Sequence, residues 1–439
     1  MRLPEFLWAT LFLAASAGAS ADPVTIIHAG RLLAVPGEEV RSRQSLIIDG
    51  DRIVEVRDGF VAPTELDAHN TIDLSGMFVL PGLIDLHVHL TSEVKPGGIL
   101  RTVTQSDAEL AITAAWNALR NLEAGFTTVL DMGEGHRAHE IAVYAVRAAV
   151  ESGKIPGPRI LAVGTPISAE ASSRTASFRK EVESSIPTEA VCSGADDCRR
   201  AVREQVRRGA DVISFYNSGS LLSKASPSQT LTGEEMSAIV ETAHALGRKV
   251  VADGGNTRDD AAGINGALRA GVDWIDTVTY PDDLTWELLL ERGVYFVPHL
   301  HALHAAVGDA PETLDQGTMY WLPRSTLESL YELKQESPSA REAYRRGVQF
   351  AFGSDPGVFP HGDNAGEFAA LVREGLSVME AVQAATINAA SALGLQDRIG
   401  TLEAGKYADL IAVSGDPLED VSVLNDVRFV MREGTVFVP

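Results

Sequence analysis

Val79-Leu80-Pro81-Gly82-Leu83-Ile84-Asp85-Leu86-His87-Val88-His89 is the stretch from which the fold of this chain can be read. Its apolar residues are typical of a buried strand, and the Pro-Gly pair marks a sharp entry. Residues two apart on a strand share a face, so His87 and His89 present both imidazoles on one side. Two neutral nitrogens at a strand end can form half of a metal site. Two histidines that alternate by chance are the alternative.

The middle of the chain alternates amphipathic helices with short apolar runs. Together with the His87 strand, these runs give candidate strands at 127–131, 159–163, 212–215, 250–252, 274–276, 295–297 and 349–352. Strands that alternate with helices are typical of a parallel sheet, and this number of them predicts a (β/α)8 TIM-like barrel over residues 79–395.

Both ends of the chain have a different pattern from the middle. Residues 22–78 and 396–439 contain short alternating strands separated by turns such as Asp49-Gly50-Asp51. Because chain ends commonly meet, we expect the two segments to form one small β-sandwich domain.

The chemistry of such a barrel lies at the carboxyl ends of its strands. The polar residues at these ends are His87 and His89, Ser214, Asp253, Thr277, His299 and His301, and Asp355. Asp355 follows a strand that runs into Gly353-Ser354. It either caps the following loop or serves as a metal ligand that accepts a proton from water.

The chain resembles the metal-dependent amidohydrolase superfamily, and within it the imidazolonepropionase and Xaa-Pro dipeptidase-like branch. The resemblance rests on the segments 76–89, 125–129, 209–213, 353–355 and 400–410. It implies a hydrolase that opens amide, ester or cyclic amide bonds with a divalent metal, often zinc, and the strand-eight aspartate. His87, His89 and Asp355 match that pattern.

Three positions depart from the pattern of that branch. Ser214 stands where binuclear relatives carry a lysine, and a hydroxyl cannot replace a bridging carbamate. Asp253 and Thr277 stand where the branch has the histidines of strands five and six. We therefore expect one metal ion in place of two.

Two ligand sets are open for a single metal ion. In the first, His87, His89, Asp253 and Asp355 bind zinc, manganese or iron. In the second, His299 and His301 supply nitrogens, because at strand spacing both would face the mouth of the barrel. This pair could instead contact substrate or donate a proton, and Tyr216 is a further candidate for substrate contact.

The first residues are typical of a secretory signal peptide. An apolar run from Phe6 to Ala17 precedes Ala19-Ser20-Ala21, which has the small-x-small form of a cleavage site. We expect residues 1–21 to be removed and the protein to be periplasmic or secreted, with a membrane anchor as the alternative. The formal charge of -23 excludes nucleic acid as a partner, because such a surface repels phosphates.

The cysteines of the chain are Cys192 and Cys198, on either side of a Gly-Ala-Asp-Asp segment. In an oxidising compartment such a pair can close a small loop, so we predict a disulfide.

The sequence thus predicts a metallohydrolase for a small-molecule substrate. Asp355 would be the general base, and His301 or His299 would assist the oxyanion. A barrel that has lost catalysis and retains ligand binding, or a metal-dependent isomerase or lactonase, are the alternatives. A homo-oligomer is compatible with the sequence.

Overall fold

The structure is a computed structural model that describes residues 24–66, 68, 70–92, 96, 104–133, 137–169, 190–219, 229–254, 260–336 and 339–439. The predicted signal peptide, residues 1–21, lies outside these residues. Among the helices that the structure describes, none has both the length and the apolar character that a membrane crossing requires.

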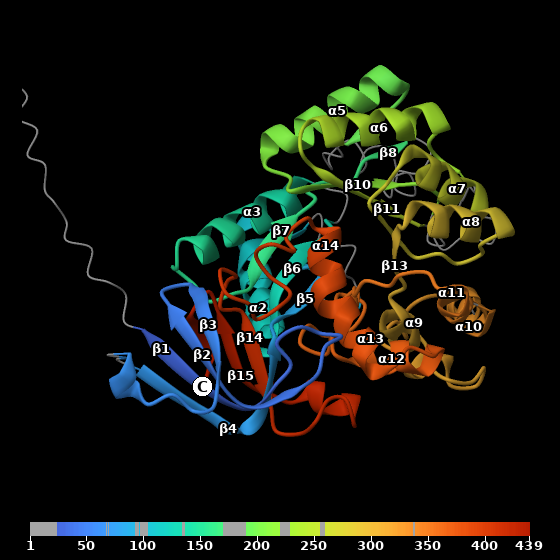
Figure 1. Ribbon diagram of the computed structural model, residues 1–439. Helices are drawn as coiled ribbons and strands as arrows, with labels where there is room; N and C mark the ends of the chain where they lie inside the picture. Colours follow the sequence, from blue (N-terminus) through green and yellow to red (C-terminus); the bar gives the residue numbers. More distant parts are fainter. Residues whose placement is uncertain are drawn as a thin grey trace, which may run out of the picture.

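Strands from both ends of the chain lie side by side in one sheet, drawn in blue and red in Figure 1. The strand order is β16-β15-β14-β4-β1-β2-β3. Their bounds are β1 (Thr25–Leu32), β2 (Arg41–Asp49), β3 (Arg52–Asp58), β4 (Asn70–Pro81), β14 (Leu410–Val413), β15 (Val427–Arg432) and β16 (Thr435–Val438). The two ends therefore meet, as predicted. Their described residues form one seven-stranded sheet, and the second sheet of a sandwich is not seen among them.

The middle of the chain contains two parallel sheets. The first holds β5 (Leu83–Val88), β6 (Phe126–Asp131) and β7 (Arg159–Ala162), and the second holds β10 (Val212–Tyr216), β11 (Lys249–Asp253), β12 (Trp274–Asp276) and β13 (Tyr295–Val297). A short pair, β8 (Ser168–Ala169) and β9 (Val191–Cys192), lies beside them. Every pairing within these sheets is parallel, because helices connect the strands.

Backbone hydrogen bonds join these two sheets at both edges. On one side, the amide of Asp211 donates to the carbonyl of Ala162 at 2.8 Å. On the other side, Phe296 and Phe350 form a parallel bridge, and the amide of Leu86 donates to the carbonyl of Phe352 at 2.9 Å. The segment 350–352 therefore lies between β13 and β5, where the predicted last strand belongs.

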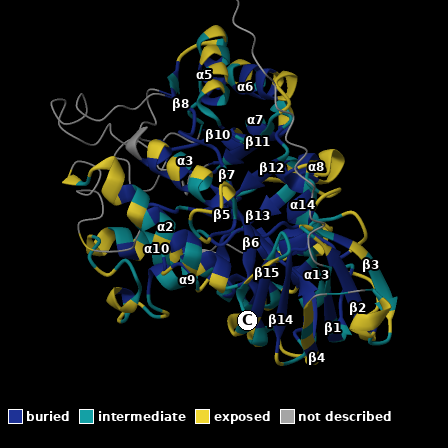
Figure 2. Ribbon diagram, turned by 90° about the vertical axis from the view of Figure 1, so that its left-hand side faces the viewer, coloured by how far each residue is buried: buried dark blue, intermediate teal, exposed yellow. Residues whose placement is uncertain are grey.

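Helices cover the outside of these sheets, with exposed residues on their outer faces (Figure 2). They are α2 (Asp107–Glu123), α3 (Arg137–Glu151), α5 (Ala195–Arg208), α6 (Gly233–Ala245), α7 (Ala261–Ala270), α8 (Asp283–Arg292), α9 (Leu300–Ala306), α10 (Arg324–Glu336), α11 (Ser339–Arg346), α12 (Gly366–Glu374), α13 (Val378–Gln383) and α14 (Ala389–Ala392). Local sequence sets several starts. Ser106 and Glu109, for example, form a capping box that begins α2.

One apolar cluster fills the space inside the parallel strands. It contains Leu86, Leu130, Val251, Val297 and Ala351, each from a different strand segment and each almost fully buried. Because this packing holds the strands rigidly, the polar residues at their carboxyl ends are fixed relative to one another.

The predicted disulfide between Cys192 and Cys198 is present, with a Cα–Cα distance of 4.9 Å. It ties β9 to the first turn of α5, and both residues are buried.

Candidate metal centre

The two histidines of the opening stretch lie at the carboxyl end of β5. Their Nε2 atoms are 3.1 Å apart, so both rings point to the same place, as the alternation predicted. His87 is buried and His89 is partly buried.

Asp355 completes a triangle with these two histidines. Its Oδ1 lies 3.3 Å from Nε2 of His89 and 3.7 Å from Nε2 of His87. The amide of Asp355 donates to the carbonyl of His87 at 3.0 Å, which fixes the aspartate against β5. The structure thus brings together the three residues that match the family pattern.

The other ring nitrogen of each histidine is occupied. Nδ1 of His89 lies 2.8 Å from the carbonyl of Gly133, which can only accept, so this nitrogen carries the proton. Nδ1 of His87 lies 2.8 Å from Oδ2 of Asp276, and it donates when that carboxylate is ionised. Both Nε2 atoms then turn a lone pair toward Oδ1 of Asp355. Three acceptors that face one another at this range are an arrangement that a cation between them would satisfy.

Asp276 is the residue whose role the sequence did not reveal. It ends β12 and is fully buried. Burial, with the charges of Asp355 and Asp85, raises the pKa of Asp276 to about 7, although the charge of His299 opposes this. No local signal in the sequence identifies its partner, because His87 lies 189 residues earlier.

His299 lies beside His87, with ring centroids 4.1 Å apart. One ligand atom each from His87, His299 and Asp355 lie within 4.8 Å of one another. Nδ1 of His299 is 3.3 Å from the hydroxyl of Thr277, and its Nε2 is buried with no hydrogen-bond partner. Burial and the charge of His87 lower the pKa of His299 to about 4, so the ring is neutral near pH 7.

Three residues around this centre have left-handed backbone. The φ angles are 56° at Thr277, 51° at His299 and 61° at Asp355. Side chains other than glycine rarely adopt this region, at a cost on the order of 1–3 kcal/mol each, and such strain is concentrated at functional sites. Each of the three residues follows a parallel strand segment. Its left-handed backbone therefore sets the direction of its side chain at the carboxyl end of the strands.

The predicted strand alternation of His299 and His301 is wrong. β13 ends at Val297, and α9 begins at Leu300 directly after the left-handed turn at His299. The His301 ring packs against Phe359, with ring centroids 4.5 Å apart, and against Gly366. His301 therefore does not share a face with His299, and its predicted catalytic and substrate-binding roles find no support in this placement.

Glu367 holds the start of α9. It is fully buried in α12 and accepts hydrogen bonds from the amides of Leu300, at 3.1 Å, and His301, at 2.6 Å. The helix has no side-chain cap of its own, because His299 occupies the cap position. Burial raises the pKa of Glu367 to about 8, although these two hydrogen bonds oppose the shift.

Asp85 ties the first strand to the last strand segment. Its Oδ1 accepts from the amides of His87 and Ser354 at 3.0 and 3.1 Å, and its Oδ2 accepts from Nδ2 of Asn364 at 2.8 Å. Burial raises the pKa of Asp85 to about 6, against the effect of its hydrogen bonds. This carboxyl group therefore fixes His87 and Asp355 relative to one another.

Asp253 and Tyr216 lie at the ends of neighbouring strands, whereas Ser214 lies in the middle of β10, because that strand continues to Tyr216. Asp253 ends β11 opposite Tyr216 of β10, and both are partly buried. The buried hydroxyl of Ser214 has no hydrogen-bond partner. The described residues whose ligand atoms converge as one group are His87, His299 and Asp355; Asp253 and His89 are outside this group, and the role of Asp253 as a ligand stays a prediction.

The donor set fits a metal ion. Zinc–nitrogen bonds are about 2.0–2.1 Å long, so two nitrogens on one tetrahedral ion lie roughly 3.3 Å apart. The triangle of His87, His89 and Asp355 has sides of 3.1, 3.3 and 3.7 Å, close to that spacing. Two imidazoles and one carboxylate are ligands typical of a catalytic site that keeps a position open for water.

Parallel strands that carry two histidines at the end of the first and an aspartate after the last are the arrangement expected of a hydrolase of the amidohydrolase type. A model of the amidohydrolase family matches residues 78–437. The chain belongs to the amidohydrolase family, and its relatives in it are hydrolases that act on carbon–nitrogen bonds.

Three relatives illustrate the match. Ochratoxinase of Aspergillus niger is 30% identical over 446 residues, covering 94% of this chain and 86% of that protein. Its crystal structure has a TM-score of 0.80 at 27% identity, over 95% of this chain and 96% of the other. A Xaa-Pro dipeptidase with bound methionine has a TM-score of 0.82 at 32% identity, over 95% and 100% of the two chains. Imidazolonepropionase of Thermoplasma acidophilum is 28% identical over 135 residues, covering 30% of this chain and 32% of that protein. The predicted branch is therefore confirmed.

Proposed function

We propose that this protein hydrolyses an amide or cyclic amide bond with one divalent metal ion, zinc, held by His87, His89 and Asp355. The observation that carries the proposal is the convergence of their three ligand atoms, 3.1 to 3.7 Å apart, at the carboxyl ends of the parallel strands. Asp253 drops out of the ligand set, and His299 stays outside it because a catalytic zinc ion keeps one position for water.

A bound ion would polarise the scissile carbonyl and lower the pKa of water. Asp355 accepts the proton of the attacking water and returns it to the departing amine. Burial alone would raise the pKa of Asp355, but this carboxylate faces His89, His87 and His299, and a positive charge there, on an imidazolium or on a bound cation, lowers the pKa of Asp355 below its usual range. The group is therefore ionised at neutral pH and ready to accept.

His299 replaces His301 in our assignment as the residue that assists the oxyanion. With the proton of His299 on Nε2, the hydroxyl of Thr277 donates to Nδ1, 3.3 Å away. This nitrogen has no hydrogen-bond partner and lies near the ligand atoms of His87 and Asp355. It can donate to the carbonyl oxygen as negative charge develops.

The names of the relatives suggest which substrates to try. Ochratoxinase and the Xaa-Pro dipeptidase support small-molecule amides and dipeptides as the first compounds. We also propose that the chain is exported after loss of residues 1–21. Edman sequencing of the mature protein would show a start at Asp22, and an intact Met1 would refute this.

The test is metal content and hydrolysis measured together. We expect near-stoichiometric zinc after purification without chelator, and turnover of at least one compound in a panel of amides, dipeptides and lactones. His87→Ala and Asp355→Asn should lose both. His244→Ala is the matched control. His244 is an exposed histidine of α6, and its ring forms a hydrogen bond with the side chain of Asp273. Absence of metal after incubation with zinc or manganese would refute the mechanism. Turnover of lactones alone would favour a lactonase.

A further inference from the structure

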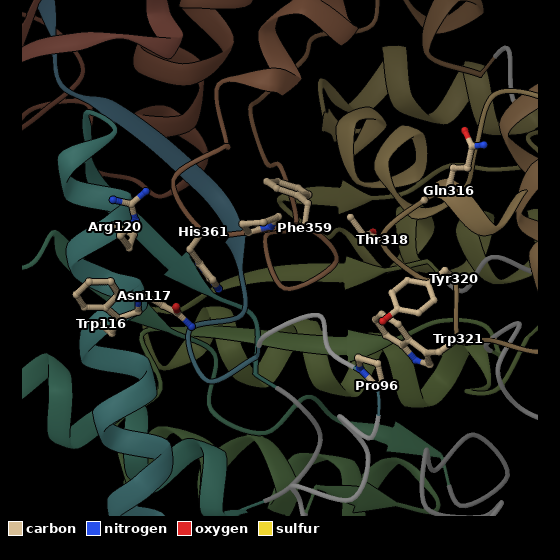
Figure 3. Close-up of a pocket in the computed structure, with 12 residues that line it drawn as sticks. Pro96, Trp116, Asn117, Arg120, Gln316, Thr318, Tyr320, Trp321, Phe359 and His361 are labelled. Carbon is tan, nitrogen blue, oxygen red and sulfur yellow. The ribbon is translucent and has the colours of Figure 1, made fainter. Parts of the chain in front are cut away.

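A cavity of about 580 Å³ lies beside the metal centre (Figure 3). Side chains of α2 form one wall, Phe359 and His361 lie between, and Tyr320 and Trp321 face them from the other side. A cavity of this volume is large enough for a small organic ligand.

The cavity does not contain the reacting groups. None of His87, His89, His299 and Asp355 is among the described residues that line it. His361 separates the two: its Nε2 lies 3.2 Å from the carbonyl of His89, and its Nδ1 lies 3.0 Å from Nδ2 of Asn121. A ligand in the cavity would therefore bind next to the metal centre without touching its ligand atoms.

Aromatic side chains are unusually exposed at this cavity. Among the large hydrophobic residues that are exposed in the described part of the chain, the two aromatic ones are Trp116, at 60%, and Tyr320, at 53%. Both line the cavity, on opposite sides. Exposed aromatic rings at a cavity are typical of a site that binds a flat ring.

One cation lines this cavity within the part of the chain that the structure describes. Arg120 of α2 contributes to the wall, and its ion pair is with Glu123, at 3.3 Å on the exposed face of the same helix. An exposed pair of this kind is weak, so the guanidinium can turn to a ligand carboxylate. The Arg120 guanidinium is therefore a local site for an anion, although the formal charge of the whole chain is -23.

We propose that this cavity is a second binding site, for an aromatic carboxylate whose ring packs against Trp116 and whose carboxylate pairs with Arg120, one turn further along α2. The site is independent of the hydrolytic reaction, because it uses none of the residues assigned to that reaction.

The experiment is calorimetric titration of the full-length protein with 1-naphthylacetate. We expect saturable binding of one ligand per chain, with 1-naphthylacetamide about tenfold weaker or more because the charge is absent. Cyclohexylacetate, which keeps the carboxylate and lacks the aromatic ring, should also bind several-fold more weakly. Equal affinity for the acid and the amide would overturn the proposal, as would a lack of saturable binding.

Variants locate the binding. Arg120→Gln should weaken binding of the acid about tenfold and leave the amide unchanged. Glu123→Gln, on the same exposed helix face, should not weaken it, because it removes a competing carboxylate. His87→Ala should bind with wild-type affinity, whether or not the protein proves to be a hydrolase. Loss of binding in His87→Ala with retention in Arg120→Gln would place the ligand at the metal centre and refute the second site.

Discussion

Replacing Asp276 by asparagine should weaken metal binding without unfolding the protein. The Asp276 carboxylate accepts from Nδ1 of His87 at 2.8 Å, and both side chains are almost fully buried. A buried hydrogen bond to a charged group contributes about 1.5–3 kcal/mol, which corresponds to a loss of roughly 10–100-fold in metal affinity. The variant keeps the shape of the site and loses the charge that sets the His87 tautomer.

The assay is competition for zinc with a chromophoric chelator, supported by thermal denaturation of the metal-free protein. Because burial raises the pKa of Asp276 to about 7, ionising this group costs the folded protein stability as the pH rises, and the cost is complete above that pH. Asp276→Asn should therefore lower zinc affinity while making the metal-free protein at pH 8 no less stable. Asp283→Asn is the control, because the side chain of Asp283 is 92% exposed. Unchanged zinc affinity in Asp276→Asn would refute the reasoning.

Three further predictions concern other parts of the site and fold. His299→Ala should keep its zinc and lose about 10²–10³-fold in kcat, as for removal of an oxyanion donor. His301→Ala should resemble the wild type in zinc content and in kcat. Loss of zinc in His299→Ala would show that His299 is a ligand. The pKa of Glu367 is raised to about 8 in the folded protein. At a pH below the pKa of this group in the unfolded chain, the group is protonated in both states and does not oppose folding. Folding stability is lost as the pH rises toward 8. Denaturant unfolding at pH 5 and pH 8 should show a smaller pH dependence in Glu367→Gln, and an unchanged one would contradict the burial effect. Reducing the disulfide between Cys192 and Cys198, which are six residues apart, should cost about 2 kcal/mol of stability and leave the zinc content unchanged. A loss of zinc in dithiothreitol would show that the disulfide and the metal site are not independent.

Much of the scaffold could be read from periodicity. The strands at 274–276 and 295–297 were predicted with the bounds that the structure gives. Helices alternate with the parallel strands along the chain, as the sequence pattern predicted. His87 and His89 share a face because strand alternation is a local property. Asp355 could be placed at the mouth because a strand running into Gly353-Ser354 is also a local pattern.

The errors have physical causes. The segment after Val297 was predicted to continue as a strand, yet residues 300–306 are Leu, His and Ala, which favour a helix and include no β-branched residue. That composition was the signal for α9. Asp276 could not be assigned, because its partner comes from a distant strand. The role of Asp253 as a ligand stays a prediction, because a position at a strand end does not determine where a side chain points.

The carboxyl group of Asp85 joins segments that are synthesised far apart in time. It lies 269 residues from Ser354, and the metal ligands His87 and Asp355 straddle the same junction. A nascent chain that stops short of Asp355 holds only the first two ligand atoms, so it cannot retain an ion in this geometry. Metal binding would then stabilise only full-length chains. Its free energy would add to that of the contacts between β5 and the segment 350–352. Zinc uptake during refolding should accordingly coincide with the last cooperative step.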